Sequence, residues 1–206
     1  FLPALRELVG LRGFLPLFGA NLLGAMAYFM IYAWLPLFLF EKFQLSLTGA
    51  GFSATFYIQI ASAAGILAGG WLADRWSRAN PRGRLFTQAI GFAAAGPALF
   101  LVATTPVFGI LIAGMLIFGL GRGFFDCNLM PVLCQVARPP LRATGYGVLN
   151  MGSTLVGGAM TAVAGAMKAT FGLGACLQLS AVLLFLGALM LLLVPVSSES
   201  ANQPPA

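Results

Sequence analysis

The chain has 206 residues, of which 60% are hydrophobic and 8% are charged; its net charge is +6 and its mean hydropathy is +0.94. A soluble domain typically carries about 25% charged residues, so this chain has too little polar surface to be one water-soluble globule. It contains no histidine and only three cysteines, which excludes histidine-based catalysis and a disulfide scaffold. We therefore expect an all-α integral membrane protein with no metal and no cofactor.

Six apolar segments are long enough to cross a bilayer, which takes about 20 residues of helix. They cover approximately residues 13–40, 49–73, 85–103, 107–136, 144–167 and 172–194. We predict a lead-in at the membrane surface over residues 1–12, a six-helix transmembrane bundle over 13–195 and a disordered cytoplasmic tail over 196–206. Because the chain begins with Phe1 and not with methionine, we expect it to be a piece of a longer protein.

The positive charges alternate between the two ends of the predicted segments. Eight arginines fall on one side, namely Arg6, Arg12, Arg75, Arg78, Arg82, Arg84, Arg138 and Arg142. The opposite side has only Lys42 and Lys168. Since cytoplasmic loops of membrane proteins are rich in lysine and arginine, both termini are predicted to be cytoplasmic. The basic residues lie at the ends of apolar runs and form no stripe on an amphipathic helix, so nucleic acid is not an expected partner; the lipid bilayer is.

The first segment has a polar face. Four residues fall on one side of the predicted helix, namely Asn21, Ala25, Tyr28 and Tyr32. An amide and two phenols are unfavourable against lipid, so this face either lines a cavity, which we favour, or forms hydrogen bonds to another helix. In the second segment the polar candidates are Tyr57 and Gln59, whose spacing of two places them on different faces.

The stretch that follows the second segment, Gly70–Arg78, reads GWLADRWSR. It resembles the G-x-x-x-D-R-x-G-R signature of the major facilitator superfamily, with Ser77 in place of the second glycine. We expect Gly70 to permit close helix packing and Asp74 to cap a helix end or to form an ion pair there. Arg75 and Arg78 are expected to anchor the loop on the cytoplasmic side.

Trp34–Phe38 resembles the seventh helix of that family, and Gly123–Asn128 followed by Arg142–Gly147 resembles the tenth and eleventh helices of its bacterial sugar-acid and organic-anion permeases. The resemblance implies helices seven to twelve of a twelve-helix transporter, built as two inverted three-helix repeats, with an N-terminal half that is missing here. It also implies a secondary active transporter of the bacterial inner membrane that moves a small organic anion, such as a sugar acid, by alternating access. The resemblance also implies that transport is coupled to H⁺ or to another cation, such as Na⁺.

The fourth segment carries two opposite charges in an otherwise uncharged run, Arg122 and Asp126. Their spacing of four places both on one helical face. Arg122 lies sixteen residues from Pro106 and from Arg138, about 24 Å from either end of the segment at the rise of an α-helix, and hence near the midplane. Intramembrane charges usually face a protein interior or a watery cavity. Either the pair only fixes the helix, or Arg122 binds a substrate carboxylate and Asp126 acts as its switch.

Glycines surround Arg122 at positions 119, 121 and 123, and Pro131 follows, so we expect this helix to bend or break locally. In the fifth segment a spacing of four relates Ser153, Gly157, Thr161 and Gly165. Such a ridge of small residues is typical of close helix packing. Asn150 and Thr154 lie on an adjacent face and are candidates for the cavity.

Other functions fit the sequence less well. A drug or neutral-sugar carrier of the same fold is the nearest alternative. An intramembrane protease needs a histidine or two facing acids, whereas Asp126 is the only acid at mid-depth, so we expect no enzyme. A channel or a structural membrane module is a further alternative, but the paired Asn-Pro-Ala motifs of water channels do not occur in this sequence.

Overall fold

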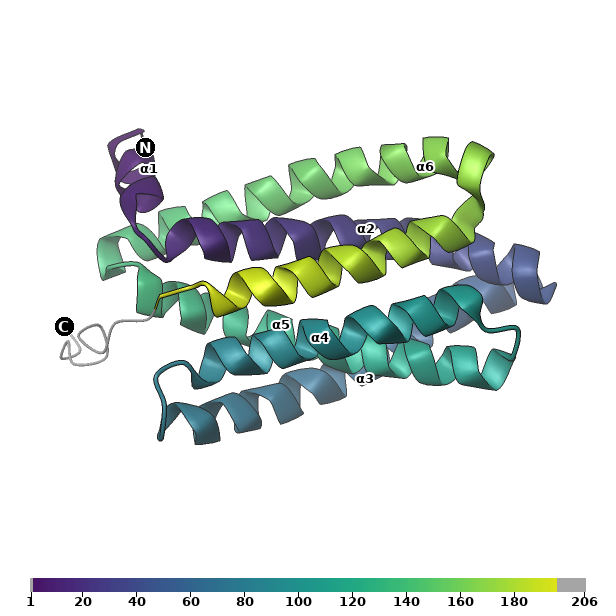
Figure 1. Cartoon of the computed structure of the whole chain (residues 1–206), viewed down its shortest axis with the longest axis horizontal. Coiled ribbons are helices and arrows are strands. Elements are labelled where there is room, and N and C mark those ends of the chain that lie inside the picture. The colour runs from purple at the N-terminus through teal and green to yellow at the C-terminus, as the bar shows by residue number, and fades with distance from the viewer. Residues whose placement is uncertain (1, 196–206) are drawn as a thin grey trace.

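The computed structural model describes residues 2–195, and within them every regular element is an α-helix (Figure 1). The helices are α1 (Leu2–Gly10), α2 (Phe14–Phe43), α3 (Leu47–Ser77), α4 (Gly83–Thr104), α5 (Phe108–Val136) and α6 (Pro139–Leu192). Local signals explain some of the boundaries: the Ser46 hydroxyl accepts a hydrogen bond from the Gly49 amide at the start of α3, and Pro139 opens α6. The predicted tail, 196–206, lies outside the described residues.

The long helix α6 contains two membrane spans. Gly172 interrupts it with a φ of 77° and a ψ of 168°, a backbone conformation that favours glycine. The chain reverses there, so that the two halves of α6 run in opposite directions (Figure 1). Helices α2 to α5 are each long and apolar enough to cross a membrane. With the two halves of α6 they make six spans, and the predicted all-α membrane fold is confirmed.

The helices pack as an elongated bundle along one axis (Figure 1). α2 packs mainly on α6 and α3 mainly on α5, while α4 contacts both α5 and α6. The predicted ridge of the fifth segment packs on α2: a Cβ at Gly165 would stand 3.1 Å from the Trp34 ring, and the Trp34 indole donates to the Thr161 carbonyl oxygen at 3.2 Å. Close packing by small residues is therefore confirmed for this ridge.

The basic residues gather at one end of the bundle. The α1–α2 junction, the α3–α4 loop, the α5–α6 connection and both described ends of the chain lie there (Figure 1). At this end Glu7 pairs with Arg138 and Asp74 pairs with Arg84 at 2.6 Å. At the other end the Lys168 ammonium lies 2.8 Å from a Glu41 carboxylate oxygen. The two ends thus differ in charge as the alternation predicts.

Of the bend or break expected in the fourth segment, the break is wrong, because α5 is one helix from Phe108 to Val136. Its glycines are contact points. A Cβ at Gly119 would stand 2.5 Å from the Ile58 carbonyl oxygen on α3, and one at Gly121 would collide with the Gly91 carbonyl oxygen on α4. Glycine therefore lets α5 approach two helices at backbone distance, while α5 itself stays helical through Pro131.

Candidate functional site

Arg122 and Asp126 form an ion pair on one face of α5, near its middle. The Arg122 Nε atom lies 3.2 Å from the Asp126 Oδ2 atom, and the two side chains are 25% and 36% exposed. The same Nε makes no aligned hydrogen bond within residues 2–195. The contact is thus an ion pair in which the N–H does not point at the carboxylate, and it leaves much of the guanidinium for other partners.

Two other helices supply those partners. Arg122 Nη1 donates to the Tyr32 hydroxyl on α2 and to the Gln59 side-chain oxygen on α3, the latter at 3.0 Å. The Tyr32 hydroxyl in turn donates to the same Gln59 oxygen at 3.2 Å. The guanidinium carbon also lies 4.9 Å from the Tyr32 ring centroid and 5.5 Å from that of Tyr28. The predicted residues Tyr28, Tyr32 and Gln59 are thereby brought together around Arg122.

Within the described chain, Arg122 Nη2 has no hydrogen-bond partner and the Asp126 oxygens have no polar partner other than Arg122, although both side chains are partly exposed. A guanidinium can form two parallel hydrogen bonds with a carboxylate. The site therefore offers donors to an anion, held in place by a phenol and an amide from neighbouring helices.

A cavity of about 230 Å³ adjoins Asp126, between α2, α5 and the first half of α6. Its lining includes Asn21, Tyr28, Asp126, Asn150 and Ser153. The Tyr28 hydroxyl is buried without a hydrogen-bond partner among residues 2–195. Its ring packs edge-on against Phe92 and Phe118, with centroids 6.2 and 5.8 Å away. Tyr28 thus joins the apolar core to the polar cavity.

Asn21 fulfils both alternatives considered for its face. It borders the cavity, but its amide nitrogen donates to the Leu149 carbonyl oxygen at 3.1 Å and to the Ser153 hydroxyl at 2.7 Å. Its side chain is only 5% exposed. The amide nitrogen of Asn21 therefore connects α2 to α6, whereas its side-chain oxygen accepts no hydrogen bond from residues 2–195 and borders the cavity.

The remaining predicted candidates lie at different places. Asn150 and Thr154 are exposed on α6, and each donates to a carbonyl oxygen one turn earlier, at 2.9 and 3.0 Å. Only Asn150 lines the cavity. Tyr57 is half-buried, stacks edge-on with Phe56 at 5.6 Å between centroids and forms no side-chain hydrogen bond within the described residues. The structure does not bring it to Arg122.

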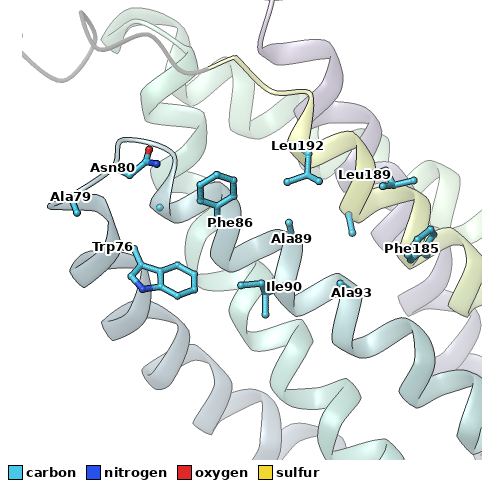
Figure 2. Close-up of a pocket in the computed structure, with 12 residues that line it drawn as sticks. Trp76, Ala79, Asn80, Phe86, Ala89, Ile90, Ala93, Phe185, Leu189 and Leu192 are labelled. Carbon is cyan, nitrogen blue, oxygen red and sulfur yellow. The ribbon is translucent and has the colours of Figure 1, made fainter.

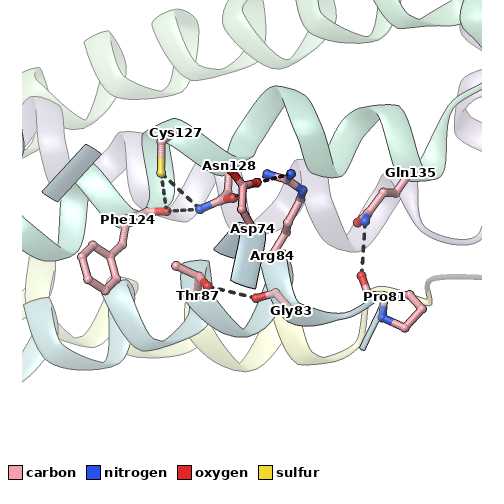
Figure 3. Close-up of polar contacts among 9 residues, drawn as sticks. All are labelled: Asp74, Pro81, Gly83, Arg84, Thr87, Phe124, Cys127, Asn128 and Gln135. Atoms are coloured by element: carbon pink, nitrogen blue, oxygen red, sulfur yellow. Dashed lines mark hydrogen bonds and ion pairs between the residues drawn. The ribbon is translucent and has the colours of Figure 1, made fainter. Parts of the chain in front are cut away.

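The loop motif forms a second polar cluster, which connects α3, α4 and α5 (Figure 3). Arg84 donates to Asp74 at 2.6 Å and to the Asn128 side-chain oxygen at 3.4 Å. Asp74 thus forms the kind of ion pair expected of it, while Arg75 and Arg78 are exposed. Asn128 was missed as a partner, because its distance of 44 residues from Arg84 gives no local signal.

The role expected for Gly70 is wrong within this chain. A Cβ at Gly70 would meet nothing within 4 Å, whereas one at Gly69 would stand 2.9 Å from the Phe124 Cα atom. Close approach of α3 to α5 therefore depends on Gly69, one residue earlier in the sequence.

Comparisons with known proteins agree with this architecture. Residues 17–206 match the sequence family described as the Major Facilitator Superfamily. No curated protein matches the chain at a significant level. Among solved structures, peptide transporter POT in complex with sulfate is similar with a TM-score of 0.71 and 24% identity, over 88% of this chain and 37% of that one. A mutant of the same transporter in complex with alafosfalin has a TM-score of 0.72 and 24% identity, over 88% and 38%.

Tetrameric PepTSo2 has a TM-score of 0.71 at 14% identity, over 92% of this chain and 45% of that one. Identities this low show a common fold alone. The chain spans less than half the length of each of these transporters.

Proposed function

Since the chain belongs to the Major Facilitator Superfamily, we propose that it is one half, helices seven to twelve, of a secondary active transporter in the bacterial inner membrane. The missing N-terminal half would complete the substrate site, and both termini of this half would face the cytoplasm, where the arginine-rich end of the bundle belongs. The proposed substrate is a small organic anion such as a sugar acid, and its transport is coupled to H⁺ or Na⁺.

The proposal rests on the position of Arg122 and on its hydrogen-bond partners. It lies in the middle of a spanning helix, where substrate sites of secondary transporters are found. Its Nη1 atom is fixed by Tyr32 and Gln59, while Nη2 has no partner among residues 2–195. A positive charge that is oriented but only partly neutralised suits a carboxylate.

Asp126 is the proposed switch. It lies against Arg122 without an aligned hydrogen bond, so an incoming substrate carboxylate can compete with it for the guanidinium. Asp126 would then move away from Arg122 or take up a proton. No other acid occupies mid-depth in the described spans, so a coupling proton carried by this half would be on Asp126.

The solved structures of similar fold are named as peptide transporters. A peptide also carries a carboxylate, so a dipeptide belongs in the substrate panel beside a sugar acid. A neutral sugar of the same size represents the drug and neutral-sugar alternative, for which Arg122 would have no ionic role.

The test is uptake by the full-length transporter in proteoliposomes, with each of these three substrates. Hydrogen bonds to charged groups contribute about 1.5–3 kcal/mol, so Arg122→Gln should raise KM for the anion at least tenfold, and Arg122→Lys should raise it less. Asp126→Asn should still exchange substrate but should not accumulate it in a proton gradient. Arg6→Gln, at the end of the bundle, is the charge control. Wild-type affinity and coupling in both Arg122→Gln and Asp126→Asn would refute the proposal.

A further inference from the structure

An apolar groove lies on a different part of the bundle from the candidate site. It has a volume of about 640 Å³, and its walls come from α4 and the last part of α6. Figure 2 shows Ile90 and Ala93 on one wall, Phe185, Leu189 and Leu192 on the other, and Trp76 at one end. None of the residues around Arg122 or lining the neighbouring cavity lies on α4. A ligand in this groove would therefore not be the transported substrate.

The groove is open at the surface of the described chain. Large apolar side chains on both walls are exposed: Ile90 is 44% exposed, and Leu189 is 46% exposed. Along α4 the lining extends from Gly83 to Ala93. At the rise of an α-helix the ten steps from Gly83 to Ala93 span about 15 Å, which is half of the roughly 30 Å hydrocarbon core of a bilayer. The groove thus has the length of one leaflet, and its end at Ala93 would lie near mid-depth.

The mouth of the groove is positively charged. The Arg82 guanidinium carbon lies 5.5 Å from the Phe86 ring centroid, and Phe86 is part of the lining. One Arg82 amino group donates to the Leu192 carbonyl oxygen at 2.5 Å, while its buried Nε has no partner within residues 2–195. Trp76 lines the groove at this end (Figure 2), and tryptophan is enriched at the level of lipid headgroups.

No acid neutralises this mouth in the described chain. The two acids at this end of the bundle are already paired, Glu7 with Arg138 and Asp74 with Arg84. Exposed Arg78, at the C-terminal end of α3, adds to the positive charge. Basic pockets between transmembrane helices, next to apolar surface, attract acidic lipid headgroups.

We propose that this groove binds one anionic phospholipid from the leaflet at the arginine-rich end. An acyl chain lies between α4 and α6, and the phosphate is held by Arg82. A second copy of the chain is a poorer occupant. A two-fold axis along the bilayer normal would place the Arg82 side chains of both copies at the same depth, where their positive charges repel each other. The lipid would join α4 to the end of α6.

The test is native mass spectrometry of the full-length protein, delipidated and titrated with phosphatidylglycerol, with phosphatidylcholine of the same acyl chains and with inorganic phosphate. Ala93 and Ala94 provide a matched pair, because both are exposed on α4 but only Ala93 lines the groove. Ala93→Phe should weaken phosphatidylglycerol binding at least fivefold, and Ala94→Phe should leave it unchanged. Leu189→Trp, from the opposite wall, should repeat the effect of Ala93→Phe.

The headgroup is tested separately. Arg82→Gln should weaken phosphatidylglycerol binding about fivefold and should leave phosphatidylcholine binding unchanged, since one arginine near the surface contributes about that factor. Arg138→Gln, at the same end but paired with Glu7, is the charge control. Inorganic phosphate should not compete, because it has no acyl chain. Three outcomes would each overturn the proposal. Ala93→Phe and Ala94→Phe could bind phosphatidylglycerol equally, or Arg82→Gln could keep the preference for phosphatidylglycerol. The third is that the protein forms a dimer that Ala93→Phe dissociates.

Discussion

Gly123 of α5 lies so close to Ile66 of α3 that a Cβ atom at position 123 would stand 2.6 Å from the Ile66 backbone nitrogen. No side-chain rotation relieves such a contact, because the neighbour is main chain. Gly123 also directly follows Arg122, whose partner Gln59 is on α3. The distance between the two helices and the geometry of the candidate site therefore depend on the same glycine.

We expect Gly123→Ala to lower the melting temperature of the full-length protein by several degrees and to weaken the Arg122–Gln59 contact, because α3 must move away. Gly158→Ala is the matched control, since a Cβ there meets nothing within 4 Å. Alanine is the better helix former by about 1 kcal/mol, so the control should be neutral or slightly stabilising. Thermal unfolding in detergent measures both, and equal melting temperatures would contradict the interpretation of Gly123 as a contact point.

Asn21→Ala removes two of the side-chain hydrogen bonds between α2 and α6. Interhelical hydrogen bonds in membranes contribute about 0.6 kcal/mol on average, so we expect a loss of about 1 kcal/mol in unfolding free energy. Asn150→Ala should cost less, because the Asn150 amide donates within its own helix. Equilibrium unfolding measures this loss. If Asn21→Ala instead changes substrate KM and leaves stability intact, Asn21 binds the ligand.

Gly172→Ala places a side chain at a φ of 77° in the reversal between the two halves of α6. Backbone strain of this kind costs about 1–3 kcal/mol, so the variant should unfold at lower denaturant concentration. Gly174→Ala is the neighbouring control, since its Cβ would make an ordinary 3.8 Å contact with the Ala103 carbonyl oxygen. Equal unfolding midpoints for the two variants would show that the reversal does not need glycine.

The Asp74–Arg84 ion pair should contribute little to stability and should depend on salt. The Asp74 side chain is 61% exposed, and such pairs contribute less than about 1 kcal/mol. A double-mutant cycle with Asp74→Asn and Arg84→Gln, measured by unfolding at low and high salt, should give a coupling energy that falls as salt screens the pair. Arg84→Gln alone should cost slightly more than Asp74→Asn, because Arg84 also donates to Asn128. A coupling energy independent of salt would argue against an ionic contact.

Much of the fold is predictable from the sequence, because each spanning helix must be apolar over its own length. The six apolar runs are local properties of the chain. So are the arginines of the 78–84 region, which separate the second apolar run from the third. The pair of Arg122 with Asp126 is local too, since four residues span one helical turn.

The rest of the site depends on distances between helices that no local pattern encodes. Gln59 meets Arg122 across 63 residues, and Asn21 meets Leu149 across 128. In the sequence, a glycine such as Gly121 fits both a helix that breaks and a helix that packs closely on a neighbour. Only the position of α4 decides between these two possibilities. For the same reason Gly69 and Gly70 cannot be ranked from the sequence.

The end of the bundle opposite the arginines has almost no loop. Its three connections are residues 44–46, residues 105–107 and the reversal at Gly172. A protease or an antibody approaching from that side therefore finds little accessible main chain outside helices. Epitope tags used to map the topology will be tolerated better in the 78–82 loop, at the other end, than at any of these three turns.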